Sequence, residues 1–241
     1  MRECLGASVG DGLAIDGGDE EAVTNGALGS RRYRIQYDGP GGHSWSAFGG
    51  ASPIHALGRA ISMFDDEATH FTARGPRTSY NVGRIGGGTS VNSIAFEAWL
   101  EVDMRSEDRT RLMGLDSIFR EIARRALREE NAARRDGDPL TLHVELVGDR
   151  PSGMTDPGDP LVQRAMAAVS ILGNAPELRT SSTDSNIPIS MGVPAITLGR
   201  GGISGNGHAP DEFWVNIDSS RAIRRALLIL LADAGIAGPA T

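Results

Sequence analysis

The sequence predicts an α/β protein into which a strand–helix–strand–strand–helix–strand unit is inserted. Three observations lead to this prediction. Between residues 30 and 147, alternating apolar and polar residues mark four strands. In the same range, apolar residues at three-to-four spacing mark two helices. The flanking residues 1–29 and 148–241 show further strand and helix patterns, but too few for a complete doubly wound sheet.

Composition narrows the class of protein. A chain of 241 residues suits one large or two small domains. The net charge of -7 argues against a nucleic-acid partner. Cys4 is the only cysteine, so no internal disulfide can form, and we expect a reducing, cytoplasmic location. The longest apolar run, residues 226–232, is too short to cross a membrane, so we expect no membrane partner.

The first elements follow from local patterns. Within the first thirty residues only Leu13 to Ile15 has a strand pattern, and it ends at Asp16. From Arg31, apolar and polar residues alternate, which predicts a strand. A helix is predicted from about Ser52, a suitable N-cap that is followed by proline.

The inserted unit continues with residues 78–85, a predicted strand closed by three glycines. Another strand is expected to turn one row of apolar side chains to the same face: Ile94, Phe96, Ala98, Leu100, Val102 and Met104. A helix over about 112–126 and a strand over 140–146 complete the unit. This order predicts a split, ferredoxin-like βαββαβ arrangement, an antiparallel sheet with two helices on one face.

After a linker over 148–160, rich in proline and glycine, the patterns predict a helix over 161–172 and short strands near 177–179 and 195–198. A final helix is expected from about Asp218. Within this part, His208 lies in the loop G-N-G-H-A-P-D-E, where it is either a metal ligand or acid/base group, or a surface histidine without a special role.

Five motifs together resemble a known family. They are G-P-G-G-H-S-W, G-G-T-S-V-N-S-I, V-D-M-R-S, S-S-T-D-S-N-I-P-I-S-M-G-V-P-A-I and G-H-A-P-D-E, in this order. Each is weak alone, but the ordered set is similar to the dinuclear-zinc peptidases and amidohydrolases. That family includes peptidase T, carboxypeptidase G, aminoacylase and succinyl-diaminopimelate desuccinylase, and the di/tripeptidase-like branch is the most similar. The resemblance covers the chain from about Leu13.

The resemblance implies a fold and a metal centre. The fold is a zinc-bearing α/β catalytic domain, here residues 1–29 with 148–241, and an inserted lid that dimerises, here residues 30–147. Asp16 corresponds to a carboxylate ligand of one zinc and His208 to the histidine ligand of the other, with cobalt or manganese as possible substitutes. From its local pattern alone, the preferred interpretation of Asp16 is a turn residue before glycine.

Three residues of the lid correspond to catalytic or substrate-contacting groups. His43 corresponds to the histidine that reaches the partner subunit's active site and donates a hydrogen bond to the oxyanion. Asn92 corresponds to a substrate contact, and Arg105 to the arginine that holds a substrate carboxylate. The alternatives are a histidine that caps local backbone, a turn asparagine, and an arginine paired with Asp103 or Glu107.

Ser182, Thr183 and Asp184 correspond to a loop that closes over the substrate. Asp184 could instead be the N-cap of a short helix that begins near Asn186.

The chain departs from the family in one respect. The family's H-x-D motif, its bridging aspartate and its Glu-Glu pair, which supplies the general base, have no counterpart here. Glu20-Glu21 follows Asp16, whereas the family's pair precedes the corresponding residue, so we reject it as the base. We therefore expect the carboxyl-terminal three-fifths or so of such an enzyme.

The resemblance implies a metal-dependent hydrolase of peptide or N-acyl amino acid amide bonds that forms a homodimer through the lid. With two zinc ions per complete active site, we expect this chain alone to retain none and to be inactive. The alternative is a non-catalytic dimerising module or a remnant of such an enzyme. A sugar- or nucleotide-binding protein has little support, since no glycine run follows the G-x-G-x-x-G pattern.

Overall fold

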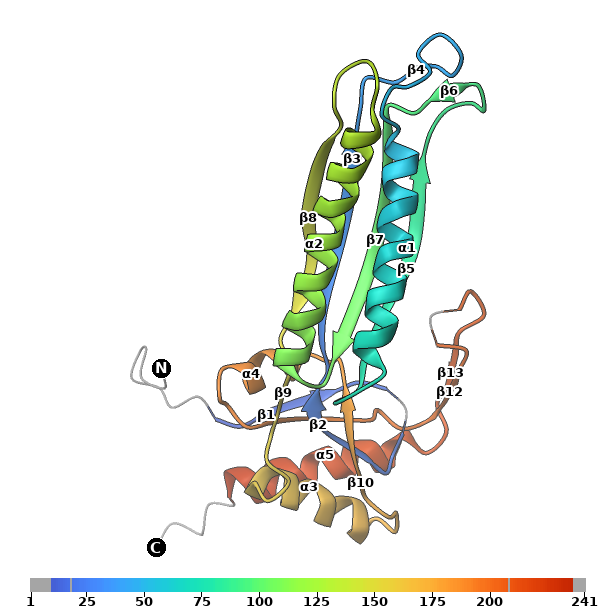
Figure 1. The fold of residues 1–241 in the computed structure, drawn as a ribbon. Helices are drawn as coiled ribbons and strands as arrows, with labels where there is room; N and C mark the ends of the chain where they lie inside the picture. Colours follow the sequence, from blue (N-terminus) through green and yellow to red (C-terminus); the bar gives the residue numbers. More distant parts are fainter. Residues whose placement is uncertain (1–9, 18, 208, 236–241) are drawn as a thin grey trace, which may run out of the picture. The chain divides into compact units, whose positions relative to one another are not determined.

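A computed structural model describes residues 10–17, 19–207 and 209–235 of the chain (Figure 1). The chain divides into two compact units. Unit 1 comprises Met1–Leu28 and Pro151–Thr241, and unit 2 comprises Gly29–Arg150. Unit 2 is thus a single continuous insertion between two segments of unit 1.

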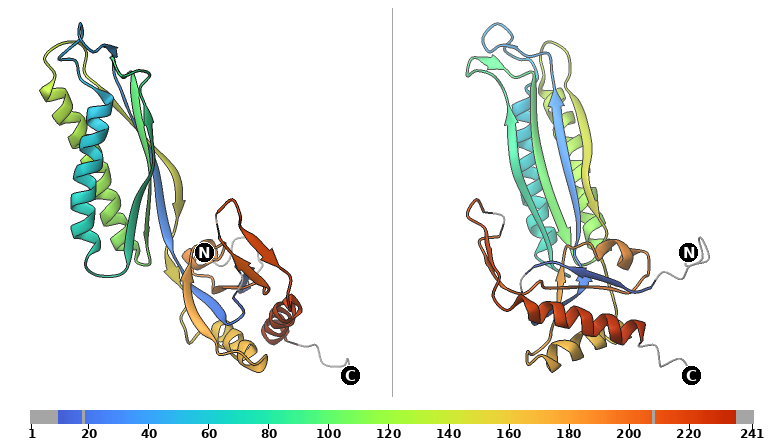
Figure 2. Two further views of the ribbon diagram at one scale, coloured as in Figure 1. Left: turned by 90° about the vertical axis from the view of Figure 1, so that its right-hand side faces the viewer. Right: turned by 180° about the vertical axis from the view of Figure 1, so that it is seen from behind.

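Unit 2 is a four-stranded sheet with two helices on one face (Figures 1 and 2). The strand order is β5-β7-β3-β8, and all neighbours are antiparallel. With its two helices, this order confirms the predicted ferredoxin-like βαββαβ arrangement. The elements are β3 (Gly29–Asp38), α1 (Pro53–Thr72), β5 (Thr78–Gly87), β7 (Glu97–Ser106), α2 (Arg109–Ala133) and β8 (Thr141–Arg150).

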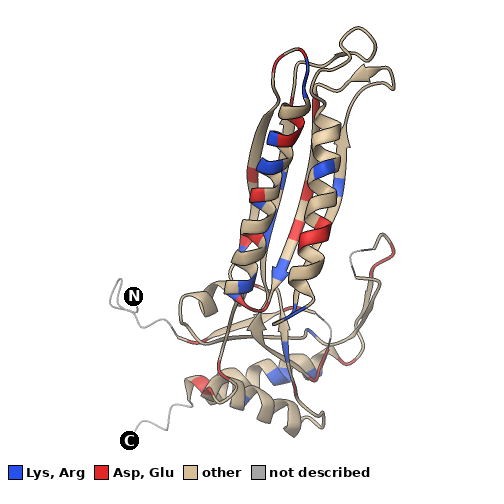
Figure 3. Ribbon diagram, viewed as in Figure 1, with Lys and Arg blue, Asp and Glu red and all other residues tan. Residues whose placement is uncertain are grey.

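The helices of unit 2 begin as the sequence predicts and pack by their apolar faces. Ser52 caps α1, and Asp108 caps α2 by accepting a hydrogen bond from the Arg111 backbone at 2.7 Å. Between the helices, Phe64 and Phe119 meet edge to face with ring centroids 5.0 Å apart. Figure 3 shows basic and acidic residues interleaved along α2, whereas on α1 a basic position is followed by acidic ones.

One end of unit 2 carries a two-stranded ladder of β4 (Gly42–His43) and β6 (Ser93–Ile94). Here the prediction that Ile94 and Phe96 continue the apolar face of the next strand is wrong. β7 begins at Glu97, and the Phe96 side chain is 58% exposed. Phe96 instead lies beside Gly41, where an added Cβ would be 2.6 Å from the aromatic ring. The alternation in the sequence therefore starts several residues before the strand begins.

Unit 1 is built on a five-stranded sheet. Its strand order is β1-β11-β2-β10, and β9 also pairs with β2. Two helices pack on the sheet through Val23, Ile196, Leu198 and Ile229. The elements are β1 (Gly12–Ile15), β2 (Ala22–Ala27), β9 (Gly153–Met154), α3 (Pro160–Ile171), β10 (Glu177–Ser181), α4 (Asn186–Ser190), β11 (Ala195–Leu198), β12 (Ile203–Gly205), β13 (Phe213–Val215) and α5 (Ser219–Ala234).

Three features of unit 1 differ from the sequence-based expectations. β2 was not predicted, although it pairs with three other strands, because all six of its residues are buried and no alternation results. The β12–β13 hairpin was also not predicted. The cap of α4 is Ser185, so the interpretation of Asp184 as an N-cap is wrong. In the described part of the chain, no helix is long and apolar enough to cross a bilayer.

Asn186 joins three separate segments of unit 1 through its buried amide. Its Nδ2 donates to the Leu28 and Pro151 carbonyls at 2.9 Å each, and its Oδ1 accepts from the Thr183 backbone at 2.9 Å. Leu28 and Pro151 are the residues at which the chain leaves and re-enters unit 1. One side chain, 1% exposed, therefore fixes both crossing points.

We expect Asn186→Ala to destabilise unit 1 by about 2–4 kcal/mol, because it leaves two carbonyls and one backbone N–H without their partner. Ile187→Ala is the matched control, since Ile187 is the next residue of α4 and is 53% exposed. We expect its cost to stay below about 0.5 kcal/mol. Hydrogen exchange of the β2 and β11 amides in increasing urea measures both changes. Equal effects of the two substitutions would contradict this role.

Candidate functional site

His43 is exposed on β4, at the end of unit 2 where β4 pairs with β6. Its Nδ1 accepts a hydrogen bond from the Trp45 backbone N–H at 3.2 Å. In a neutral imidazole one nitrogen accepts and the other carries the proton. The proton of neutral His43 therefore lies on Nε2, which becomes a donor. Among the described residues, Nε2 has no recorded hydrogen-bond partner.

Asn92 immediately precedes β6, the strand that pairs with His43. Its carbonyl accepts from the Ser44 backbone at 2.9 Å, and its side-chain Oδ1 accepts from Ser90 Oγ. Both contacts fit the alternative that Asn92 is a turn residue. The structure nevertheless brings His43 and Asn92 together, two residues that are 49 positions apart in the sequence.

Arg105 lies at the opposite end of the sheet from His43. Arg105 is on β7, where its register partner is Ser30, near the start of β3. β4 follows the other end of β3, beyond Asp38. Eight residue steps along β3 separate these ends, about 26 Å. The two residues are therefore not brought together within one unit 2.

The Arg105 guanidinium is held by a carboxylate. Its Nε donates to Asp103 Oδ2 at 2.6 Å, while Arg32 Nε donates to Asp103 Oδ1 at 2.8 Å. Burial raises the pKa of the Asp103 carboxyl, but the hydrogen bonds from both arginines outweigh it, so the pKa is lowered. Asp103 is one of the two partners expected if Arg105 is an ordinary ion-paired arginine. The hydrogen bond fixes Nε of Arg105 and thereby the direction of its two terminal nitrogens.

The predicted metal ligands do not form a centre in the described structure. Asp16 is exposed after β1, and its Oδ1 accepts from the Gly17 backbone at 2.7 Å, as a turn residue would. His208 lies outside the described residues. No group of three or more potential ligands comes together in residues 10–17, 19–207 and 209–235. The described residues alone therefore do not fit a zinc centre.

The segment after β10 divides into buried and exposed residues. Thr183 is 7% exposed, and its Oγ1 lies 2.7 Å from Thr197 Oγ1, so its hydroxyl belongs to a buried network. Ser182 is half-buried and Asp184 is exposed. Of these three residues, Asp184 has the side chain most accessible to a ligand.

Two buried residues were missed as important positions. The sequence predicts a short helix from near Asn186, as α4 confirms, but nothing in a single sequence marks the three backbone contacts of its side chain. Glu130 is 5% exposed near the end of α2 and was not considered. It follows Ala126 by four positions on the apolar stripe of the helix. An acidic residue on that stripe is a usable signal for a buried charge with a partner.

Acid unfolding tests the Asp103–Arg105 pair. A carboxyl whose pKa is lower in the folded state than in the unfolded chain adds stability above its unfolded-state pKa. The contribution is lost as the pH falls through the folded-state pKa. We expect the wild-type chain to lose more stability than Asp103→Asn between pH 5 and pH 2, by roughly 1 kcal/mol or less because the pair is partly exposed. Urea unfolding at several pH values measures this. Glu107→Gln, at an exposed carboxylate, is the control, and a matching loss in Asp103→Asn would contradict the pair's role.

Comparison with known proteins identifies a domain and several solved structures that are similar to this chain. Residues 25–131 match the peptidase dimerisation domain of the M20 family. No curated protein sequence matches the chain. Among solved structures, aminopeptidase PepT from Bacillus cereus is 19% identical with a TM-score of 0.73, and the alignment covers 95% of this chain and 58% of that one.

Two further structures are similar. A tripeptidase from Staphylococcus aureus is 22% identical with a TM-score of 0.70, covering 94% of this chain and 58% of that one. A hydantoinase/carbamoylase family amidase from Burkholderia vietnamiensis is 17% identical with a TM-score of 0.63, covering 92% and 52%. The chain thus spans between about half and three-fifths of the structures that it matches. Residues 25–131 thus match a peptidase dimerisation domain, and the fold of the chain is similar to that of these peptidases and amidases.

Proposed function

We propose that the chain supplies the dimerisation lid and the substrate-binding groups of a metal-dependent hydrolase that cleaves peptide or N-acyl amino acid amide bonds. The observation that carries this proposal is the placement of a hydrogen-bond donor, His43, and a carboxylate-binding group, Arg105, at opposite ends of one rigid sheet. Unit 2 is the lid in this proposal, and the homodimer forms through it.

His43 is suited to stabilise an oxyanion. The backbone N–H of Trp45 fixes the imidazole through Nδ1, so Nε2–H of the neutral ring is presented as a donor. A fixed donor stabilises the negative charge that develops on the carbonyl oxygen of a scissile amide without reorganising during the reaction. Asn92, which immediately precedes β6, offers amide hydrogens to the same substrate.

Arg105 is suited to hold a substrate carboxylate. A guanidinium can use Nε for one carboxylate, here Asp103, and keep its terminal nitrogens for a second. Because His43 and Arg105 are about 26 Å of strand apart in one chain, they contact the same small substrate only when they come from different subunits. The proposal therefore requires the dimer for a complete site.

The metal ions are assigned no step here. Asp16 and His208 are the proposed ligands of the two metals, and Ser182 and Asp184 are proposed to contact substrate. A bound zinc in such a site would activate water and polarise the amide carbonyl. The described residues offer too few ligands for such a site, and no candidate general base is assigned among them.

A second function is a non-catalytic dimerising module. The absence of a ligand cluster among the described residues favours it. The two functions differ in peptide binding. A hydrolase part binds a dipeptide through Arg105 and loses this binding in Arg105→Gln, whereas a module that only dimerises binds no dipeptide in either form. Calorimetric titration with glycylglycine, a dipeptide without apolar side chains, decides between them.

We expect the purified chain to hydrolyse no dipeptide, tripeptide or N-acyl amino acid in the presence of zinc or cobalt. Loss of a general base alone costs about two to four orders of magnitude in rate. We also expect less than one zinc per chain after dialysis, measured by elemental analysis. Metal-dependent turnover that Asp16→Ala and His208→Ala abolish would show a complete site and contradict this expectation.

The homodimer is expected to form through the free edge of β5. A two-fold axis places the centre of an edge strand opposite its own copy. In β5 the central residues are Val82 and Gly83, whereas in β8 Glu145 is central, and like charges that face each other are unfavourable. β5 is therefore the edge that pairs with itself at the lower cost.

Proline at the two edges tests this choice. Gly83 and Val147 are both bulge positions, skipped in the pairing of β5 with β7 and of β8 with β3. Proline there removes an N–H without breaking a regular pair in the sheet. We expect light scattering at about ten micromolar to show a monomer for Gly83→Pro and a dimer for Val147→Pro and the wild type. A wild-type monomer, or the opposite pattern, would contradict the β5 interface.

A further inference from the structure

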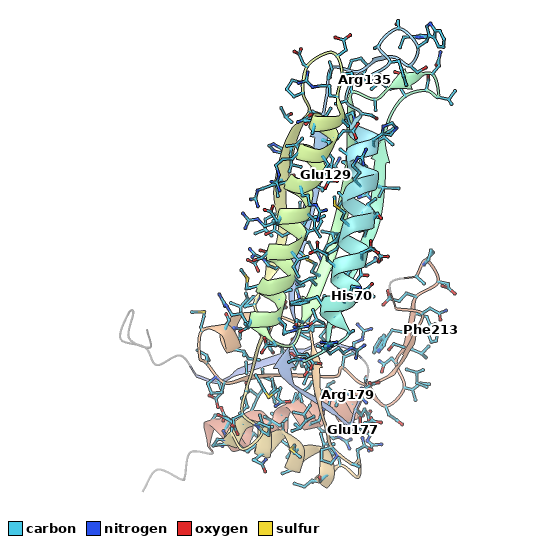
Figure 4. All side chains as sticks on the ribbon, in the orientation of Figure 1. His70, Glu129, Arg135, Glu177, Arg179 and Phe213 are labelled. Atoms are coloured by element: carbon cyan, nitrogen blue, oxygen red, sulfur yellow. The ribbon has the colours of Figure 1, made fainter. Side chains whose placement is uncertain are left out.

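A hollow of about 540 Å³ lies at the end of unit 2, bounded by the start of α1, the end of α2, the loop after β4 and the residues around β6. We call it the tip pocket. None of the residues predicted as catalytic, substrate-binding or metal-binding is among those that line it. Its lining includes Phe48, Ile54, Arg59, Glu130, Arg134 and Arg135. Figure 4 labels Arg135 where α2 ends, close to the β4–β6 end of unit 2.

The wall of the pocket is fixed by a buried carboxylate. Glu130 Oε1 accepts from the Ser52 backbone N–H at 3.0 Å, and Oε2 accepts from Arg59 Nε at 3.1 Å. These bonds join the N-cap and the second turn of α1 to the last turn of α2. α1 has no acidic residue in its own first turn, so Glu130 supplies the negative charge at that helix end. The pocket is thereby held open by a preformed contact.

The remaining charge in the pocket is positive. Glu130 is balanced by Arg59, and Arg134 and Arg135 add two further guanidinium groups. Neither has an ion pair recorded within the described chain. Arg135 lies over the Phe48 ring with 4.9 Å between Cζ and the ring centroid, and Arg134 donates to the Gly137 carbonyl. In a chain of net charge -7, two arginines without a carboxylate partner form a local site for an anion.

Apolar side chains surround these arginines. Phe48 is 74% exposed, Val91 is fully exposed and Ile54 is 47% exposed. Exposed apolar groups around a concave basic site suit a ligand with an apolar body and one negative group. A bare anion would leave these surfaces in contact with water.

The pocket is connected to the ladder that carries His43. Ser44 and Ser93, which line the pocket, are the neighbour and the strand partner of His43. The Trp45 backbone N–H in the same loop donates to His43 Nδ1. A ligand that fills the pocket therefore contacts the two segments that orient His43.

We propose that the tip pocket binds a small monocarboxylate with an apolar body, through Arg134 and Arg135, and that its occupation further restrains the loop that holds His43. The binding does not depend on the proposed hydrolase function, whereas the consequence for His43 rests on it. The two can fail separately, because binding is measured without catalysis.

Calorimetric titration of the full chain with 4-methylpentanoate tests the pocket. We expect one site per chain, with at least tenfold weaker binding of the neutral isostere 4-methylpentanamide and of inorganic phosphate. Arg135→Gln should weaken 4-methylpentanoate binding about tenfold. Arg128→Gln is the matched control, because Arg128 lies near the end of α2, pairs with Glu121 and does not line the pocket. Arg105→Gln should bind as the wild type does, which separates this pocket from the proposed substrate contact.

Two results would overturn the proposal. Equal affinity for the acid and its amide would show an apolar hollow without an anion site. Equal affinity of Arg135→Gln and Arg128→Gln, with both variants melting at the wild-type temperature, would place the ligand elsewhere. The loop is followed through Trp45, which is 86% exposed. A fluorescence change on binding that is lost in Trp45→Phe is expected, and an unchanged response in that variant would overturn the coupling to His43.

Discussion

The buried amide of Asn186 is the interaction on which the two-unit organisation of the chain depends. A buried asparagine must satisfy its donors and acceptor, since an unmade hydrogen bond inside a protein is costly. Here the partners are backbone groups of three segments that are far apart in sequence: Leu28, Pro151 and Thr183. The insertion of a long segment into unit 1 is tolerated because the ends of that segment are fixed by a single group.

A long sheet determines what unit 2 can do. Ten-residue strands are stiff when they are paired on both sides and covered by helices, and β3 and β7 have both properties. A residue at one end of the sheet therefore keeps its distance from a residue at the other end. In our proposal this stiffness has two consequences. It presents His43 to the substrate of a second subunit, and it keeps Arg105 at the substrate of its own subunit. The same rigidity would transmit little of a change at the tip pocket along the sheet, so the loops around β4 and β6 respond locally.

The sequence predicted the elements with strong periodicity and failed where burial or local contacts override it. The strands and helices of unit 2 followed from alternation and three-to-four spacing. β2 was missed because its A-V-T-N-G-A residues are all buried and mostly small. For the candidate site, the ordered motifs located His43 and Asn92, which the structure brings together, but not their distance from Arg105. The position of Glu130 on an apolar stripe indicates a buried charge, but neither its partners nor those of Asn186 follow from local patterns, because these contacts join residues far apart in the sequence.

The contacts of Asn186 also make unit 2 a replaceable module. Since one nitrogen bonds both carbonyls, the oxygens of Leu28 and Pro151 cannot be further apart than twice 2.9 Å. Ends this close can be joined by a short glycine-containing turn. Evolution, or a protein engineer, could thus remove the whole segment from Gly29 to Arg150, or exchange it for another with closely spaced ends, without unravelling the sheet that receives it. Proteins built on unit 1 are thereby free to gain or lose such a segment while their remaining core is retained.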